Sequence, residues 1–232
     1  MGSQRRIGFV GQGFIGKSYA DDFEARGFEV VRYALEEPYK HNKEKVAECD
    51  IVFVAVPTPT TPEGYDDSIV RSAVALARND ATIVIKSTML PGMTQSIQDA
   101  HPKKIVMHSP EFLRATNAAY DAAHPARNII GITKQEHERV AREVLALFPK
   151  APYELVCSVR EAELIKYAGN FFLYLKVLFA NIVFDLAGAE GAEYEVIRRA
   201  VSADPRIGPS HLAVSHVSGH KGSKEGRGAG GL

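Results

Sequence analysis

Short apolar runs alternate with segments of helical periodicity through the first 157 residues of the chain. This alternation is typical of βαβ units, which build a mostly parallel sheet. The run 51–56 is apolar at every position, as expected for a strand that helices cover on both faces. Seven runs are predicted to be strands: Arg6–Val10, Glu29–Tyr33, Asp50–Val56, Thr82–Lys86, Lys104–His108, Asn128–Ile132 and Tyr153–Cys157. The pattern therefore predicts an α/β fold with a doubly wound, mostly parallel sheet.

The pattern changes after residue 157, where a long helical stretch begins. Ser158 and Glu161 form a capping box at its start, and Gly188 is predicted to end the helix after about Ala187. Apolar side chains lie nearly all the way round this helix, so we expect it to be buried on most sides, against a second copy of itself. These positions are Phe171, Phe172, Leu173, Leu175, Val177, Leu178, Phe179, Ile182 and Val183. We predict a first domain at residues 1–157, a long-helix central domain at 158–232, and a homodimer formed through the long helix.

The last part of the chain carries weaker patterns. A short helix is predicted at Tyr194–Ser202, and from Ser215 onward the sequence is polar and glycine-rich without periodicity, as in a mobile loop. The apolar stretch Phe171–Leu186 does not reach the roughly 18 to 20 uninterrupted residues that a membrane span needs. It is interrupted by Lys176, Asn181 and Asp185. No membrane partner is predicted.

Composition adds few constraints. The 28 basic residues balance 28 acidic residues, so no basic surface is expected for a nucleic acid or an anionic membrane. The two cysteines, Cys49 and Cys157, are too few for a disulfide scaffold and follow strand-like patterns. We interpret both as structural and expect a cytoplasmic protein without a metal site. No signal-peptide pattern precedes the first strand.

A glycine motif follows the first predicted strand. Gly11, Gly13 and Gly16 form a G-x-G-x-x-G pattern that opens an amphipathic helix. In such a turn the first glycine permits a tight bend, the second admits a pyrophosphate, and the third lets helix and strand pack closely. The helix N-terminus adds partial positive charge. The alternative is a glycine-rich turn without a ligand. We predict a Rossmann-type dinucleotide site, with NAD as the cofactor, in which these glycines, Phe14 and Ile15 contact the ligand.

The acidic residue that such a site usually carries about 20 positions later is absent from the end of the second strand. Residues 33–35 are Tyr, Ala and Leu, and Glu36 and Glu37 come slightly late. We expect Glu36 to reach the ribose hydroxyls, although both glutamates could equally be solvated loop charges. Arg32 keeps a 2′-phosphate, and hence NADP, open as an alternative.

Further segments occur in the order that one enzyme family shows. They are Val54-Ala55-Val56-Pro57-Thr58-Pro59, Lys86-Ser87-Thr88, Pro91-Gly92-Met93-Thr94, Ser109-Pro110-Glu111-Phe112-Leu113-Arg114, the set Glu163, Lys166 and Asn170, and Asp204-Pro205-Arg206-Ile207-Gly208. Each segment alone has modest specificity, but together they cover essentially the whole chain. With them the sequence resembles the UDP-glucose/GDP-mannose 6-dehydrogenase family.

The resemblance implies an NAD-dependent oxidation of a nucleotide sugar, UDP-glucose above others, at C6. Two successive hydride transfers would take the alcohol to an aldehyde and then, through a cysteine thiohemiacetal and thioester, to the carboxylate. The resemblance also implies site residues. They are cofactor contacts at Val56, Pro57, Thr58, Ser87 and Thr88, catalytic roles for Thr88, Glu111, Lys166 and Asn170, and substrate contacts at Glu111, Phe112, Leu113, Arg114, Lys166, Asn170 and Arg206.

The chemistry of these residues agrees with part of the implied scheme. Lys166 and Asn170 are four apart on the long helix, so they share one face and can converge on one oxygen. A cation and an amide donor there would stabilise a developing alkoxide or thiohemiacetal oxyanion. Thr88 and Glu111 follow strands at the carboxyl edge, where open α/β sheets bind ligands, and the family places this glutamate as acid, base or water activator.

Local alternatives remain for each of these side chains. Lys166 could extend to solvent, with Asn170 satisfied locally. Thr88 could cap a helix, Glu111 could begin one, and Arg206 could only brace a turn.

The sequence departs from the family pattern in two places. The family's second glutamate, four residues after the first on the same helical face, is replaced by Ala115. The family's catalytic cysteine follows a G-G-x segment, and this chain ends at Gly230-Gly231-Leu232. We therefore expect a fragment without that thiol and without the C-terminal domain that binds the nucleotide sugar. Cys157 is about three helical turns from Asn170, so we interpret it as structural and not as a substitute nucleophile.

Two other functions stay open. A β-hydroxyacid dehydrogenase would also use a G-x-G-x-x-G domain, a long helix and a Lys-x-x-x-Asn pair, and its single oxidation needs no cysteine. The Pro57-Thr58-Pro59 and Ser109–Leu113 segments argue against it. The chain could also be a non-catalytic dinucleotide-binding module.

Overall fold

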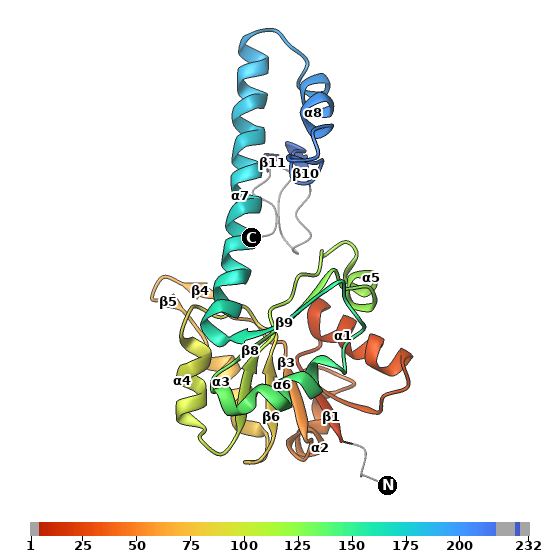
Figure 1. Cartoon of the computed structure of the whole chain (residues 1–232), viewed down its shortest axis with the longest axis vertical. Coiled ribbons are helices and arrows are strands. Elements are labelled where there is room, and N and C mark those ends of the chain that lie inside the picture. Colours follow the sequence, from red (N-terminus) through yellow and green to blue (C-terminus); the bar gives the residue numbers. More distant parts are fainter. Residues whose placement is uncertain (1–4, 217–225, 228–232) are drawn as a thin grey trace. The chain divides into compact units, whose positions relative to one another are not determined.

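The computed structural model describes residues 5–216 together with 226 and 227 (Figure 1). By its internal contacts the chain divides into two compact units, Met1–Lys166 and Tyr167–Leu232. The functional boundary expected between residues 157 and 158 stays a prediction.

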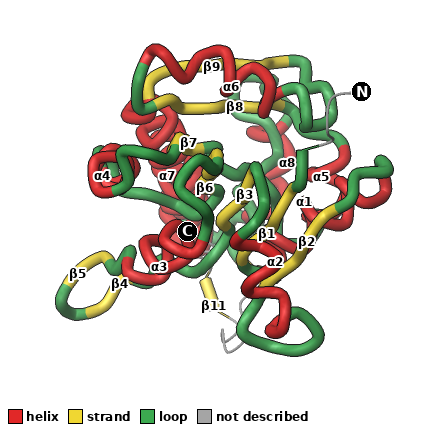
Figure 2. The backbone as a smooth tube through the Cα atoms, turned by 90° about the horizontal axis from the view of Figure 1, so that it is seen from below, coloured by secondary structure: helices red, strands yellow, loops and turns green. Residues whose placement is uncertain are grey.

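A seven-stranded sheet forms the centre of the first unit (Figure 2). Its strands lie in the order β2-β1-β3-β6-β7-β8-β9, and every neighbouring pair is parallel except β7 with β8. The strands are β1 (Ile7–Val10), β2 (Val30–Tyr33), β3 (Ile51–Val54), β6 (Thr82–Ile85), β7 (Ile105–His108), β8 (Arg127–Ile132) and β9 (Tyr153–Ser158). All seven correspond to predicted strands, which confirms the mostly parallel α/β sheet.

Helices cover both faces of this sheet, as the doubly wound prediction requires. One face packs against α1 (Phe14–Ala25), α5 (Ala118–Ala123) and α6 (Glu138–Leu145) around a cluster of aromatic rings that includes Phe9, Phe23 and Phe53. The other face packs against α2 (Lys43–Ala47), α3 (Ser68–Leu76) and α4 (Met93–Ala100), mainly through valine and isoleucine. Two short 3-10 turns, Lys40–Asn42 and Gln135–His137, precede α2 and α6.

The strand order positions a ligand site. β2 and β3 lie on opposite sides of β1, so the sheet reverses direction of winding at β1. Open α/β sheets bind ligands at the carboxyl ends of strands beside such a reversal. The carboxyl ends of β1, β3, β6 and β7 share this edge because these four strands are parallel neighbours. A small hairpin of β4 (Thr60–Thr61) and β5 (Gly64–Tyr65), which the sequence did not predict, follows β3 at the same edge.

A long helix, α7 (Val159–Ala189), begins in the first unit and continues into the second. The predicted capping box is present at its start: the Ser158 backbone N–H donates to Glu161 Oε2 at 2.8 Å, and the Glu161 N–H donates to Ser158 Oγ at 3.3 Å. The helix runs through Gly188 and ends at Ala189, so the predicted end was two residues early. Gly191, at φ +67°, makes the C-terminal turn, and the Ala192 N–H donates to the Ala187 carbonyl at 2.8 Å.

The second unit adds α8 (Tyr194–Ser202), as predicted, and the paired strands β10 (Ser215–His216) and β11 (Gly226–Arg227). Its buried cluster consists of Ala180, Leu212 and Val214, with Tyr194 packed against them. The expected mobile loop falls largely on residues 217–225 and 228–232, which lie outside the described residues.

The long helix is largely exposed in the single chain, so its expected burial against a second copy stays a prediction. Phe171, Phe172, Ile182 and Leu186 are each between 58% and 62% exposed. The described part of the chain has too few other elements in the second unit to cover a helix that is apolar all round. By length and composition alone, α7 is also apolar enough to cross a membrane.

Candidate functional site

The glycine loop after β1 is held in a tight bend. Gly11 has φ +91°, and its N–H donates to the Tyr33 carbonyl of β2 at 2.9 Å. A Cβ at Gly11 would lie 2.2 Å from the Ala55 carbonyl oxygen, and one at Gly16 would lie 2.0 Å from the Gly11 carbonyl oxygen. Only glycine fits at these two positions, because the first must bend and the third must let α1 approach the strand.

Gly13 differs from its neighbours because it faces open space. A Cβ built there meets no atom within 4 Å. The residue precedes α1, which has no side-chain cap and no acidic residue in its first turn. The N–H groups of that turn and the helix dipole are therefore available to an anion. These features fit the pyrophosphate of a dinucleotide, as the sequence motif predicts.

The loops after β3 and β6 are tied to each other. The Val56 N–H donates to Ser87 Oγ at 3.0 Å, and the same hydroxyl donates to the Val56 carbonyl at 2.7 Å. The Thr88 carbonyl accepts from Thr58 Oγ1 at 3.1 Å and from the Tyr65 hydroxyl at 2.6 Å. The predicted cofactor residues of these loops thus lie together, and buried Ser87 joins them. Thr88 does not cap a helix, because α4 begins five residues later after Gly92.

Glu111 and Lys166 form a buried ion pair beyond β7. Lys166 Nζ lies 2.7 Å from Glu111 Oε1 and 2.9 Å from the Glu111 carbonyl oxygen, and the two residues are 9% and 7% exposed, respectively. Glu111 Oε2 accepts from the Leu113 N–H at 2.9 Å. The alternative of a solvated Lys166 is therefore wrong. Glu111 also does not begin a helix, because residues 111–114 have no regular structure, and the position of Ala115 is not on a helical face with it.

The residues after Glu111 make contacts of their own. The Phe112 ring lies 3.7 Å below the Arg127 guanidinium, measured from its centroid, and 5.9 Å from Lys166 Nζ. Arg114 donates through its Nη2 to Asp121 Oδ1 at 2.6 Å, so it braces this loop onto α5. Leu113 packs against the aromatic core.

The roles of three further site residues stay predictions. Asn170 follows Lys166 by four residues on α7 but belongs to the second unit, so its role stays a prediction. Arg206, in the same unit, donates to Asp204 at 2.6 Å and is mostly exposed. Glu36 lies exposed three residues after the end of β2.

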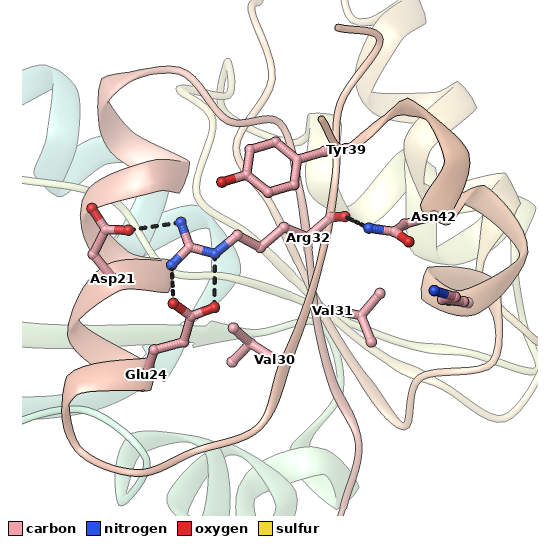
Figure 3. Close-up of a pocket in the computed structure, with 8 residues that line it drawn as sticks. Asp21, Glu24, Val30, Val31, Arg32, Tyr39 and Asn42 are labelled. Carbon is pink, nitrogen blue, oxygen red and sulfur yellow. Dashed lines mark hydrogen bonds and ion pairs between the residues drawn. The ribbon is translucent and has the colours of Figure 1, made fainter. Parts of the chain in front are cut away.

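Arg32 is committed to two carboxylates of α1 (Figure 3). Its guanidinium donates to Asp21 at 2.7 Å and to both oxygens of Glu24 at 2.6 and 3.0 Å. Asn42 donates to the Arg32 carbonyl, and the Tyr39 ring lies beside the guanidinium. Since two carboxylates already neutralise this charge, Arg32 is a poor ligand for a 2′-phosphate, which argues against NADP.

Lys86, the first residue of the Lys86-Ser87-Thr88 segment, is a buried charged group without a predicted role of its own. It is 3% exposed, and its Nζ donates to Ser109 Oγ at 3.1 Å and lies 4.1 Å from the Tyr19 ring centroid. Burial lowers its pKa from 10.5 to about 7, opposed by the carboxylate of Glu111. The lysine was visible in its segment, but only the structure shows that its ammonium is buried.

Glu163 is a second buried group without a predicted role. It is 0% exposed, and its carboxylate accepts from the Gly92 N–H at 2.6 Å and the Thr94 N–H at 3.0 Å. These donors begin α4, some 70 residues earlier in the chain. Its place in the Glu-x-x-Lys segment was a visible signal, but only the structure shows its partners.

Neither cysteine has the properties of a nucleophile. Burial raises the pKa of Cys49 to about 11 and that of Cys157 to about 11. A thiol must ionise to attack a carbonyl, so both are held in the unreactive form near neutral pH. Within the described residues, no group of three or more His, Cys, Asp or Glu side chains is placed to hold a metal ion.

Comparison with known proteins assigns both parts of the chain to one dehydrogenase family. Residues 34–149 match the NAD-binding domain of the UDP-glucose/GDP-mannose dehydrogenase family, and residues 160–227 match the family's central domain. The glycine loop precedes the first matched range, so its assignment rests on its geometry.

Individual relatives are similar over most of the chain. A UDP-glucose 6-dehydrogenase from Rickettsia typhi is 34% identical over 207 residues, which are 82% of this chain and 47% of the relative. UDP-glucose 6-dehydrogenase YwqF from Bacillus subtilis is 33% identical over 179 residues, covering 72% and 40%. The solved structure of a UDP-glucose dehydrogenase from Pyrobaculum islandicum has a TM-score of 0.80 and 29% identity, covering 91% of this chain and 60% of that one. The chain spans less than half the length of both curated relatives.

Proposed function

The chain belongs to the UDP-glucose/GDP-mannose dehydrogenase family, and on this basis we propose that it forms the cofactor side of an NAD-dependent nucleotide-sugar 6-dehydrogenase. UDP-glucose is the proposed substrate, because the curated relatives described above are UDP-glucose 6-dehydrogenases. The observation that supports an enzyme most directly is the buried pair of Glu111 and Lys166 at the sheet edge that also carries the glycine loop.

The order of loops along this edge supports the proposal. β1, β3, β6 and β7 are successive neighbours, so three strand spacings, about 14 Å, separate the glycine loop from Glu111. The proposed cofactor contacts at Val56, Pro57, Thr58, Ser87 and Thr88 belong to the two loops between these ends. The site therefore offers an anion-binding turn at one end and a charged pair at the other.

NAD, when bound, supplies the hydride acceptor of the reaction. The backbone around Gly13 and the first turn of α1, with Phe14 and Ile15, would hold its pyrophosphate, and Glu36 would reach the ribose hydroxyls. The engaged state of Arg32 favours NAD over NADP, because a 2′-phosphate would have to displace Asp21 and Glu24.

In the proposed reaction, the C6 hydroxyl of the sugar loses a proton as hydride leaves the same carbon. The Lys166 ammonium would stabilise the developing alkoxide, and Glu111 would accept the proton directly or through one water. The carboxylate also holds the ammonium in one direction through their 2.7 Å contact. Thr88 and Asn170 are proposed to contribute a hydroxyl and an amide to the same oxygen, and Arg206 to contact the sugar.

In the scheme that the family resemblance implies, oxidation of the aldehyde to the carboxylate proceeds through a cysteine thiol, and the two cysteines of this chain are poorly suited to that role. The pKa of each thiol is raised to about 11. We therefore assign dinucleotide binding and oxidation of the alcohol to the site residues described above. The thioester stage is not assigned to Cys49 or Cys157. Product stoichiometry in a complete enzyme separates the alternatives: a 6-dehydrogenase forms two NADH per sugar, and a β-hydroxyacid dehydrogenase forms one per substrate.

The exposed helix α7 supports a homodimer as the working form. Its large apolar side chains would leave water if a second copy packed against them. We propose this dimer in the cytoplasm and no membrane insertion, since Lys176, Asn181 and Asp185 would be costly in a lipid environment.

Calorimetric titration of the chain with NAD, NADP and UDP-glucose tests the proposed function. We expect NAD to bind in the micromolar-to-millimolar range of Kd, NADP to bind more weakly, and UDP-glucose to bind feebly. Tight binding of UDP-glucose with no detectable binding of NAD would show that the site is assigned to the wrong ligand.

A further inference from the structure

A carboxylate of α7 caps a helix that lies far away in the sequence. Glu163 is fully buried, and its two oxygens accept separate N–H groups: Gly92 donates to Oε2 at 2.6 Å and Thr94 donates to Oε1 at 3.0 Å. A buried carboxylate is costly unless its oxygens are satisfied. Both oxygens are satisfied here, by the first turn of α4.

Helix α4 depends on this contact because it has no cap of its own. Its N-cap residue is Gly92, at φ +92°, which offers no side-chain acceptor, and the first turn contains no acidic residue. The partial positive charge of the helix start therefore faces the Glu163 carboxylate. Charge-assisted hydrogen bonds of this kind are stronger than neutral ones, so the contact is a firm link between α4 and α7.

The same link reaches both loops of the candidate site. Lys166 follows Glu163 by three residues, less than one turn along α7, and its ammonium contacts Glu111 in the loop after β7. Gly92, on the other side of the link, follows Thr88 by four residues in the segment after β6. One turn of α7 therefore holds the segment after β6 through Glu163 and the loop after β7 through Lys166.

We propose that Glu163 is a positioning residue of this site: by capping α4 it sets the axial position and rotation of the first turns of α7, up to Lys166, so that the Lys166 ammonium stays on Glu111. The effect of this contact on catalysis rests on the proposed function. The effect on the position of Lys166 does not rest on it, and that position can be probed on this chain without any cofactor or sugar.

Selective chemical labelling of lysine tests the proposal. The chain is treated briefly with a small amine-acylating reagent, and mass spectrometry measures labelling of Lys166 relative to Lys150, whose side chain is 87% exposed. In Glu163→Gln, which keeps the shape but loses the charge and one acceptor, the ratio should rise about fivefold or more, because the ammonium spends more time away from Glu111. Hydrogen exchange at the Gly92 and Thr94 amides should also accelerate.

Glu161→Gln is the matched control. Glu161 lies on the same helix and also accepts backbone and hydroxyl hydrogen bonds, but only from Ser158 at the exposed start of α7. Its labelling ratio should stay within about twofold of the wild type, because α4 keeps its cap.

Two outcomes would overturn the proposal. If Glu163→Gln accelerates exchange at Gly92 and Thr94 without changing the labelling of Lys166, Glu163 only caps α4. If neither readout changes, the contact does not hold these elements. Should Glu163→Gln fail to fold, as judged by circular dichroism, Glu163→Asp keeps the charge on a shorter side chain. The Lys166 ratio should then rise at least about twofold, and a wild-type ratio would refute the role.

Discussion

At the scale of single residues, the ammonium group of Lys86 is buried against a hydroxyl and two aromatic rings. It donates to the Ser109 hydroxyl and faces the Tyr19 and Phe148 rings, at 4.1 and 4.9 Å from the ring centroids. A hydroxyl and two aromatic faces replace only part of the hydration that a charged amine loses. Burial therefore lowers the pKa of Lys86 to about 7.

This shifted pKa predicts a dependence of stability on pH. In the unfolded chain the amine has its ordinary pKa of 10.5, so between about pH 7 and 10.5 the unfolded state binds a proton that the native state has lost. The free energy of unfolding should rise with pH across this window, by at most about 1.4 kcal/mol per pH unit from this residue. Below about pH 7 both states are protonated, and the contribution stays constant at its least favourable value.

Urea denaturation of Lys86→Met against the wild type measures this contribution. The difference in unfolding free energy between the two proteins should change across the window, because methionine has no proton to lose. Lys150→Met, at an exposed position, should keep the wild-type slope. Parallel curves for the wild type and Lys86→Met would mean that the native amine keeps its ordinary pKa.

At the scale of elements, two glycines of the turn between β1 and α1 have different roles: Gly16 serves packing, and Gly13 is proposed to serve binding. A side chain at Gly16 would collide with the Gly11 carbonyl oxygen, whereas one at Gly13 would point into open space. The two positions lie three residues apart in one motif, yet they meet different neighbours.

Alanine substitutions at these two positions should affect different quantities, namely stability at Gly16 and NAD affinity at Gly13. Gly16→Ala should lower the free energy of unfolding by at least about 1 to 3 kcal/mol, because the strand and helix must separate. Gly13→Ala should change it by less than about 1 kcal/mol, but should weaken NAD binding about tenfold or more by blocking the approach of the pyrophosphate. Thermal unfolding and calorimetry measure the two quantities. Unchanged NAD affinity in Gly13→Ala would move the pyrophosphate away from this turn.

At the scale of the whole molecule, the exposed apolar surface of α7 is of the kind that association with a partner buries. A soluble single chain rarely leaves a large continuous apolar patch in water. Phe171, Phe172 and Ile182 are all more than half exposed on this one helix. Because a twofold dimer brings the same surface of each copy together, a single helix can cover itself in this way.

The association state of the chain tests this interpretation. Light scattering coupled to size-exclusion chromatography should give the mass of a dimer, and the double substitution Phe172→Asp with Ile182→Asp should give a monomer with intact NAD binding. Lys134→Glu, on the surface of the first unit, should remain dimeric. A wild-type monomer that instead sediments with lipid vesicles would favour a membrane contact for this helix.

The fold was predictable where its causes are local. The seven strands were visible because residues such as 51–54 are apolar on both faces, and the capping box of Ser158 and Glu161 needed only residues three positions apart. The β4–β5 hairpin was not predicted, because each of its strands has only two residues and no alternation of apolar and polar positions. The end of α7 was placed early because a glycine stops a helix only where the backbone turns, which happens at Gly191 and not at Gly188.

The sequence predicted which residues belong to the candidate site better than it predicted their contacts. Glu111 and Lys166 were both nominated, but their direct ion pair spans 55 positions and has no signature in spacing. Arg32 was considered a phosphate ligand because its partners on α1, Asp21 and Glu24, could not be foreseen.

The amino-acid sequence by itself determined the class of fold, the glycine turn and the family, because short-range periodicity and ordered motifs carry that information. Only the tertiary structure decided which charges are buried and what they touch: Lys86 on Ser109, Lys166 on Glu111, and Glu163 on the start of α4. The physical reason is that burial and pairing depend on the packing of segments distant in sequence, and a charged side chain in a strand or helix pattern looks the same whether it meets water, an aromatic ring or a carboxylate.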